Sequence, residues 1–170
     1  MNNKVKAFSM IIFGLVLTGA GCARTPSEYA ANKAAKKLIE SNTNGDVKVD
    51  VQNNNFKYKG NGVDLVTGAD VKLPADFPSD VYINVGKLIS AASFTSNQAF
   101  QVSIETGKSA AEAYQFYQDK LKADGWSITG TMSFGEVSTV TAEKDTRIVS
   151  AMISKSDTSA SLVTITVSKK

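Results

Sequence analysis

The sequence has no histidine, a single cysteine and only three prolines among its 170 residues. The absence of imidazole excludes catalytic triads that use histidine, as well as histidine-ligated zinc and haem. The Ser-x-x-Lys and Lys-Thr-Gly motifs, the phosphate-binding loop and the dinucleotide fingerprint are also missing. The sequence therefore assigns no catalytic residue, no metal and no cofactor.

Basic and acidic residues are nearly balanced. The chain carries 19 basic and 16 acidic residues, and without Lys4 and Lys6 the count is 17 against 16. The charges are interspersed, so the sequence has no basic patch of the kind that binds phosphate backbones. We therefore expect no nucleic-acid partner.

Long apolar runs are missing as well. The longest, "AFSMIIFGLVL", has eleven residues and follows the basic start "MNNKVK". A membrane-spanning helix needs about 20 apolar residues, whereas a short apolar run between basic and small residues is typical of a secretory signal. We expect residues 1–21 to be a signal peptide that is removed.

The lone cysteine, Cys22, follows that run within "LTGAGCAR". This stretch resembles the lipobox of bacterial lipoproteins, in which a cysteine at the first mature position is acylated. The resemblance implies export and anchoring through lipid on Cys22 to the outer face of a bacterial membrane in the cell envelope. Two acyl chains are enough for stable anchoring. A plain secreted protein with an unpaired thiol is the alternative.

Residues 22–69 are predicted to form an N-terminal helix and a β-meander. Thr25, Pro26 and Glu28 are typical of a helix start, and Gly45 follows the expected end. Clustered lysines in this helix leave open an interfacial position beside a membrane. Alternating apolar residues then predict short strands, namely Val47, Val49, Val51, Phe56 and Tyr58.

Residues 70–170 are predicted to form the main domain, and the stretch "LPADFPSD" near its start marks the joint with the preceding subdomain. Ser109 and Glu112 form a capping box for one helix, and Gly125 is placed as its C-terminal stop. Short strands with turn signals between them predict hairpins. The predicted fold class is α+β: an antiparallel sheet of five to six strands packed against one helix, preceded by the small helix plus β-meander subdomain.

The elements "DFP" and "EAYQFYQDKLKADGW", followed by threonine-rich strands, resemble a type of uncharacterised bacterial secreted or lipid-anchored protein. In that type a proline-flanked "DFP" precedes a helix of the form "FY..KL...GW". The resemblance covers most of the chain after Cys22. It carries no assigned activity and transfers no catalytic residue.

These observations favour a non-enzymatic binding or structural module of the envelope, with an envelope protein or glycan as partner. Its expected binding surface includes Tyr58, Phe77 and Tyr82. A spacer domain without any ligand is a second interpretation. The alternative is an enzyme, namely a carboxylate-based hydrolase that acts on envelope glycans. Such an enzyme needs two acids held about 5–10 Å apart. The candidate pairs are Asp76 with Asp80, Asp46 with Asp50, and Glu143 with Asp145.

Overall fold

The computed structural model describes nearly all of the chain from Asp46 onward, together with parts of a preceding helical segment. Residues 35–170 form one compact unit. The expected signal peptide, Cys22 and the expected helix start at Thr25 lie outside the described residues. The described residues are 33, 36–37, 40–41, 46–52, 55–84, 86–156 and 160–170.

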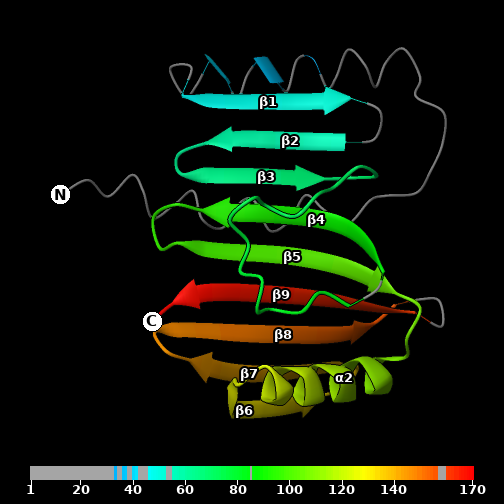
Figure 1. The fold of residues 1–170 in the computed structure, drawn as a ribbon. Helices are drawn as coiled ribbons and strands as arrows, with labels where there is room; N and C mark the ends of the chain where they lie inside the picture. Colours follow the sequence, from blue (N-terminus) through cyan, green and yellow to red (C-terminus); the bar gives the residue numbers. More distant parts are fainter. Residues whose placement is uncertain are drawn as a thin grey trace. The chain divides into compact units, whose positions relative to one another are not determined.

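A single antiparallel sheet of nine strands dominates this unit (Figure 1). Its strand order is β1-β2-β3-β4-β5-β9-β8-β7-β6, so every strand pairs with an antiparallel neighbour. Short turns join most consecutive strands. The strands are β1 Val47–Gln52, β2 Asn55–Gly60, β3 Val63–Thr67, β4 Lys87–Phe94, β5 Ala99–Thr106, β6 Ser127–Phe134, β7 Val137–Lys144, β8 Arg147–Lys155 and β9 Ser161–Lys169.

The predicted fold class, with five to six strands and a separate helix plus β-meander subdomain, is wrong. The meander strands are present, but β3 pairs with β4 over five residues, from Val63 opposite Phe94 to Thr67 opposite Ser90. The meander therefore extends the main sheet. In an isolated meander, the backbone groups of β3 that point away from β2 would have no strand partner, and pairing with β4 supplies one.

One helix, α2 Ala110–Ala123, covers β6 to β9 on one face of the sheet. Its start is the predicted capping box, in which Ser109 Oγ accepts from the Glu112 N–H at 3.3 Å and Glu112 Oε2 accepts from the Ser109 N–H at 2.9 Å. Its end is a Schellman motif, with the Trp126 N–H donating to the Leu121 carbonyl at 2.9 Å. Gly125, at φ +81, supplies the left-handed residue that this motif requires.

The apolar side of the sheet changes face along its width. On the face covered by α2, one row across the strands runs from buried apolar residues to charged ones: Val140, Ala151, Ile165, Val102, Ala91, Val66, Lys57, Asp50. On the opposite face, the neighbouring row runs from polar to apolar: Thr141, Ser150, Thr166, Gln101, Ala92, Leu65, Tyr58, Val49.

The change occurs at β4, where two consecutive residues that face opposite sides, Ala91 and Ala92, are both buried. The main core therefore lies between α2 and β4 to β9, and a smaller cluster around Val47, Val49 and Tyr58 lies on the other face of β1 to β3. Each end of the sheet has its own core.

Between β3 and β4 the chain makes a long excursion, which we call the crossing segment, residues 68–84. It passes in front of β4 and β5 on the side of α2 (Figure 1), and Val81, Phe77 and Ile83 pack against the main core. The prolines that predicted a domain joint lie in this excursion. None of the helices in the described part of the chain has the length and apolarity needed to cross a membrane.

Candidate functional site

The three residues predicted as a binding surface do not lie together. Tyr58 is 7 % exposed and belongs to the smaller cluster. Phe77 and Tyr82 lie on the crossing segment, where Phe77 is half-buried and Tyr82 is 39 % exposed. The structure therefore brings two of the three aromatic residues to one segment and places the third inside a core.

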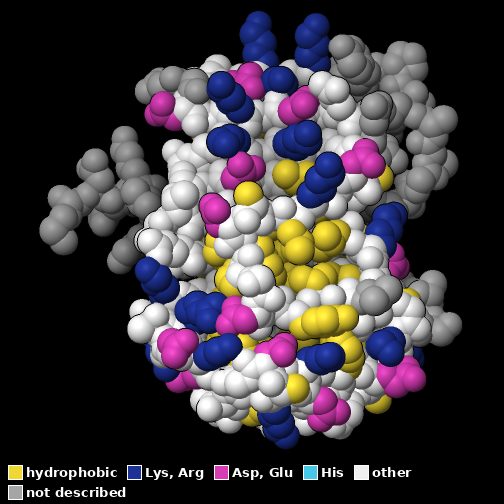
Figure 2. Space-filling model, viewed as in Figure 1, with side chains coloured by type: hydrophobic (Ala, Val, Ile, Leu, Met, Phe, Trp, Pro, Cys, Tyr) yellow, Lys and Arg dark blue, Asp and Glu magenta, His cyan; other side chains and the backbone are white. Residues whose placement is uncertain are grey.

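Aromatic contacts hold the crossing segment in place. The Phe77 ring meets the Phe100 ring edge-on at 5.8 Å, and the Tyr82 ring meets the Phe116 ring at 5.3 Å. Such pairs each contribute about 0.5–1.5 kcal/mol beyond the burial of area. Apolar side chains gather where this segment crosses the middle of the sheet (Figure 2). The segment is thus an apolar cover for β4 and β5.

A hydrogen bond fixes the end of the segment to α2. The Asn84 N–H donates to the Tyr117 hydroxyl at 3.2 Å. Burial raises the pKa of Tyr117 to about 12, because ionisation would place a charge within the core. The side-chain nitrogen Nδ2 of Asn84 is buried and has no hydrogen-bond partner within the described part of the chain.

Asp80 is the centre of an ionic cluster that ties the crossing segment to β7 and β8. Arg147 donates to both Asp80 carboxylate oxygens, at 2.8 and 2.7 Å, and Lys144 Nζ lies 3.1 Å from Oδ2. The Trp126 indole N–H donates to the Asp80 carbonyl at 3.0 Å, and the Arg147 guanidinium lies 5.1 Å from the Trp126 ring centre. The segment is therefore held by both the side chain and the backbone of Asp80.

This cluster determines the protonation state of Asp80. The hydrogen bonds from Arg147, with further help from Lys144, lower the pKa of Asp80 from 3.8 to about 2, although burial opposes the shift. The same carboxylate raises the pKa of Arg147. Asp80 thus stays ionised near neutral pH with both oxygens occupied, which suits an ion pair and not a proton donor.

The remaining predicted carboxylates have structural or exposed positions. Glu143 forms an ion pair with Lys170, and Asp50 accepts from the Gln52 side chain at 3.1 Å. Asp76 is exposed on the crossing segment. The described residues include no group of three histidine, cysteine, aspartate or glutamate side chains able to hold a metal ion.

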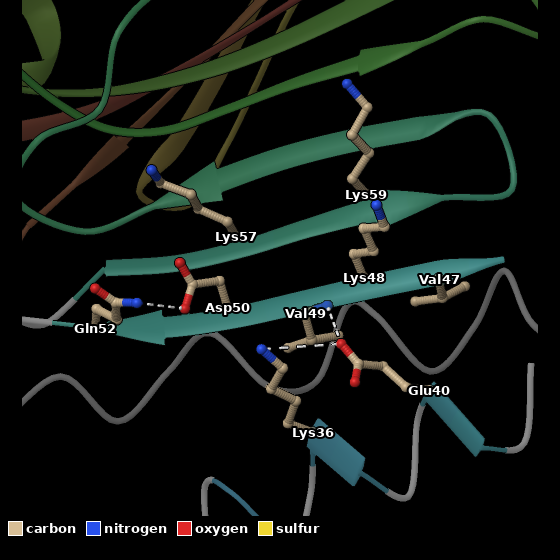
Figure 3. A pocket seen from close by; sticks show the side chains of 9 residues that line it. All are labelled: Lys36, Glu40, Val47, Lys48, Val49, Asp50, Gln52, Lys57 and Lys59. Atoms are coloured by element: carbon tan, nitrogen blue, oxygen red, sulfur yellow. Dashed lines mark hydrogen bonds and ion pairs between the residues drawn. The ribbon is translucent and has the colours of Figure 1, made fainter. Parts of the chain in front are cut away.

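A hollow of about 630 Å³ surrounds the edge strand β1 (Figure 3). Its lining side chains do not converge. Lys48, Asp50 and Lys57 point to one side of the strands, whereas Val49 and Glu40 lie on the other. A binding site needs polar groups that point into one enclosed space, so we do not place the site here.

The second hollow, about 520 Å³, lies at the turn between β4 and β5, where the crossing segment meets the ends of β8 and β9. We call it the hairpin hollow. Its lining combines aromatic and aliphatic side chains with two cations and one acid, a combination that suits an amphipathic molecule. The residues are Asp76, Pro78, Ser93, Phe94, Thr95, Gln98, Ala99, Phe100, Arg147, Val167, Ser168 and Lys169.

The sequence analysis singled out neither Arg147, which lines the hollow, nor Trp126, which lies beside Arg147 and is buried in the main core. Arg147 offered one signal, since it is one of only two arginines in a chain rich in lysine, and arginine is favoured where a carboxylate is held through two hydrogen bonds. Its partner lies 67 residues away, a separation that no local pattern reveals.

Comparison with known proteins gives one match. Residues 88–168 are similar to the family described as START domain-like. The match runs from β4 to β9 with α2, and leaves β1 to β3 and the crossing segment outside. No curated protein matches, and no solved structure matches.

Proposed function

We propose that this protein is a lipid-anchored, non-enzymatic binding module of the bacterial cell envelope, and that its ligand is an amphipathic molecule held in the hairpin hollow. The observation that carries the binding proposal is the hollow itself. Its volume falls within the 300–1,000 Å³ typical of small-molecule sites, and Phe100 and Pro78 offer it an apolar lining on the face of the sheet that α2 covers.

The charges at the hollow narrow the class of ligand. Arg147 and Lys169 line it together with one acid, Asp76. The Arg147 guanidinium is already engaged by both Asp80 carboxylate oxygens, so Lys169 is the cation that an anionic headgroup would meet. An acyl or other apolar chain carrying an acidic headgroup fits this pattern. The START domain-like match contributes most of the residues that line the hollow and is compatible with ligand binding.

Binding can be measured through the single tryptophan. Trp126 is the only tryptophan of the chain, and it contacts Arg147, which lines the hollow. Titration with decanoate below its micelle concentration should change Trp126 fluorescence saturably, and decanol should bind more weakly because it lacks the charge.

A matched pair of variants locates the site. Phe100→Ser should weaken decanoate binding about tenfold, since a buried aromatic contributes roughly 1.5–3 kcal/mol. Phe134→Ser, the same change at an exposed phenylalanine outside the hollow, should leave binding unchanged. Absence of saturable binding, or equal loss in both variants when both remain folded, would contradict the proposal.

The anchor is tested separately on Cys22. The membrane-extracted protein should have the mass of residues 22–170 plus acyl chains. The Cys22→Ser variant should lose both the added mass and retention in the membrane fraction. An unmodified mass in the soluble fraction would mean that the N-terminal stretch is an export signal alone, whatever the outcome of the ligand titration.

Among the described residues, no feature favours the alternative hydrolase. Its best candidate, Asp80, is fully engaged by Arg147 and Lys144, and a general acid must hold its proton near the working pH. Asp76→Asn remains a direct test, since turnover of an envelope polysaccharide that this change abolishes would revive the hydrolase.

A further inference from the structure

The two edges of the sheet differ in protection. Along β1, the charged side chains of Lys48 and Asp50 alternate with valines. In addition, Glu40 Oε1 accepts a hydrogen bond from the Val49 N–H at 3.2 Å, which occupies one backbone donor of this edge. The other edge, β6, has the sequence "SITGTMSF", without charge or proline, and is exposed along almost its whole length. Proteins block free edges with charges, proline or covering elements. Helix α2 covers one face of β6, and the register is irregular between Ile128 and Gly130. From Gly130 to Phe134, however, no charge, proline or other described element blocks the free edge.

Apolar side chains gather beside this free edge. Met132, Phe134, Val137 and Met152 are 63, 84, 37 and 41 % exposed. Met132 and Met152 both lie opposite Thr139, and Phe134 lies opposite Val137, so all four share the face turned away from α2. We call them the β6 patch. A grouped apolar patch at a sheet edge is typical of an interaction surface.

We propose that β6 pairs with β6 of a second copy of this chain, antiparallel and about a twofold axis at Met132. In this register Met132 faces its own copy, Thr131 faces Ser133, and Phe134 faces Gly130. The pairing uses only the stretch from Gly130 to Phe134, which is regular beyond the irregularity between Ile128 and Gly130. The same surface then serves both partners, as a twofold interface requires.

The side chains of this register are self-complementary. Phe134 protrudes from the edge, whereas a Cβ placed on Gly130 would meet nothing closer than the Thr141 Cβ at 3.8 Å. The open space over Gly130 in one copy receives the Phe134 ring of the other. An aromatic ring laid over an edge glycine is a known stabilising pair in sheets.

The backbone supports the same register. Gly135 and Glu136 form a two-residue turn in which Gly135, at φ +58, takes the first central position, as in a type II′ hairpin. Phe134 and Val137 close this turn, so by alternation the backbone groups of Thr131 and Ser133 point away from β7. These are the two residues that face each other across the proposed twofold axis.

A second copy suits this edge better than a lipid surface does. The hairpin tip carries Glu136, paired with Lys155 at 3.6 Å, and a carboxylate opposes insertion beside anionic lipids. One strand pair with its patch buries less than the roughly 800 Å² per partner of a standard interface. We therefore expect a dimer of modest affinity, in the micromolar range.

Disulfide trapping tests the register. In the full chain carrying Cys22→Ser, Met132→Cys places two cysteines face to face, with Cα atoms about 4.5–5.5 Å apart and within disulfide range. The control Thr139→Cys lies on the same face one strand inward, about 14 Å from its copy across three strand spacings. Mild oxidation at micromolar protein should give a covalent dimer at least tenfold faster for Met132→Cys. Equal rates, or no dimer from either variant, would overturn the proposal.

Sedimentation velocity gives a readout without cysteine. The Cys22→Ser chain should show concentration-dependent dimerisation, and Phe134→Ser should raise its dissociation constant about tenfold or more. Leu73→Ser, at an exposed leucine on the crossing segment, should leave that constant unchanged. A chain that stays monomeric well above the micromolar range, or a β6 patch that binds vesicles as a monomer, would refute pairing between copies.

Discussion

Replacing Asp80 by asparagine keeps the shape of the side chain and removes the charge that Arg147 and Lys144 bind. The free energy of unfolding should fall at neutral pH. The lowered pKa, from 3.8 to about 2, corresponds to about 2.4 kcal/mol at 1.36 kcal/mol per pKa unit. Because the Asp80 side chain is 30 % exposed, solvent screening reduces this figure, and we expect a loss of about 1 kcal/mol.

The loss should depend on pH in a defined direction. The folded state lowers the pKa of Asp80, so its contribution is present above the unfolded value near 4 and disappears as pH falls through about 2. Protonated aspartic acid resembles asparagine in shape and charge. The two proteins should therefore differ fully at pH 7 and converge between pH 4 and pH 2.

Urea unfolding followed by circular dichroism measures this difference, with Trp126 fluorescence as a second probe. Asp76→Asn is the control, because Asp76 lies on the same segment, is exposed and forms no ion pair with any described residue. It should cost nothing measurable at any pH. An Asp80→Asn loss that is as large at pH 2.5 as at pH 7, or an equal loss from Asp76→Asn, would refute the ionic account.

Three further substitutions test the local structure by the same urea assay. Ser109→Ala removes the capping side chain of α2 and should cost about 1 kcal/mol, whereas no loss would mean that the cap contributes nothing. Gly125→Ala places a Cβ at φ +81 and should cost about 1 kcal/mol or more, and a neutral result would refute the strain argument. Tyr117→Phe leaves the Asn84 N–H without its acceptor and should cost about 1–2 kcal/mol at pH 7. Burial raises the pKa of Tyr117 from 10 to about 12, so the folded wild type holds this proton more tightly than the unfolded chain does. Its free energy of unfolding should therefore fall as pH rises from 10 toward 12. The variant should therefore lose less stability than the wild type across that range, and equal losses would refute the assignment.

Local patterns in the sequence predicted local structure well. The capping box at Ser109 and Glu112 and the stop at Gly125 mark helix ends through backbone hydrogen bonds between neighbours, so a short stretch contains all the information needed. The alternation of Val47, Val49 and Val51 predicted a strand correctly for the same reason. Alternation shows that one side of a strand is buried. It does not show whether that side is the same face of the sheet that other strands bury.

The errors arose where distant segments meet. The prolines around Phe77 were interpreted as a joint, yet the chain before them returns to pair with the chain after them, since β3 and β4 complete one sheet. Tyr58 was predicted to be a surface residue although it shares the apolar alternation of Val47 and Val49. That shared periodicity was the available signal for burial. The Asp80 and Arg147 pair carries no local signal at all.

The change of apolar face at β4 has a consequence for how the molecule opens. Among the described helices and strands, β1 to β3 and their cluster around Val47, Val49 and Tyr58 contact the rest of the sheet through the β3 and β4 pair alone. Stability in proteins is divided among cooperative units that open separately. Amide protons of β1 and β2 should therefore exchange through a partial unfolding of lower free energy, while the amides of β5, β8 and β9 exchange only when the whole chain unfolds.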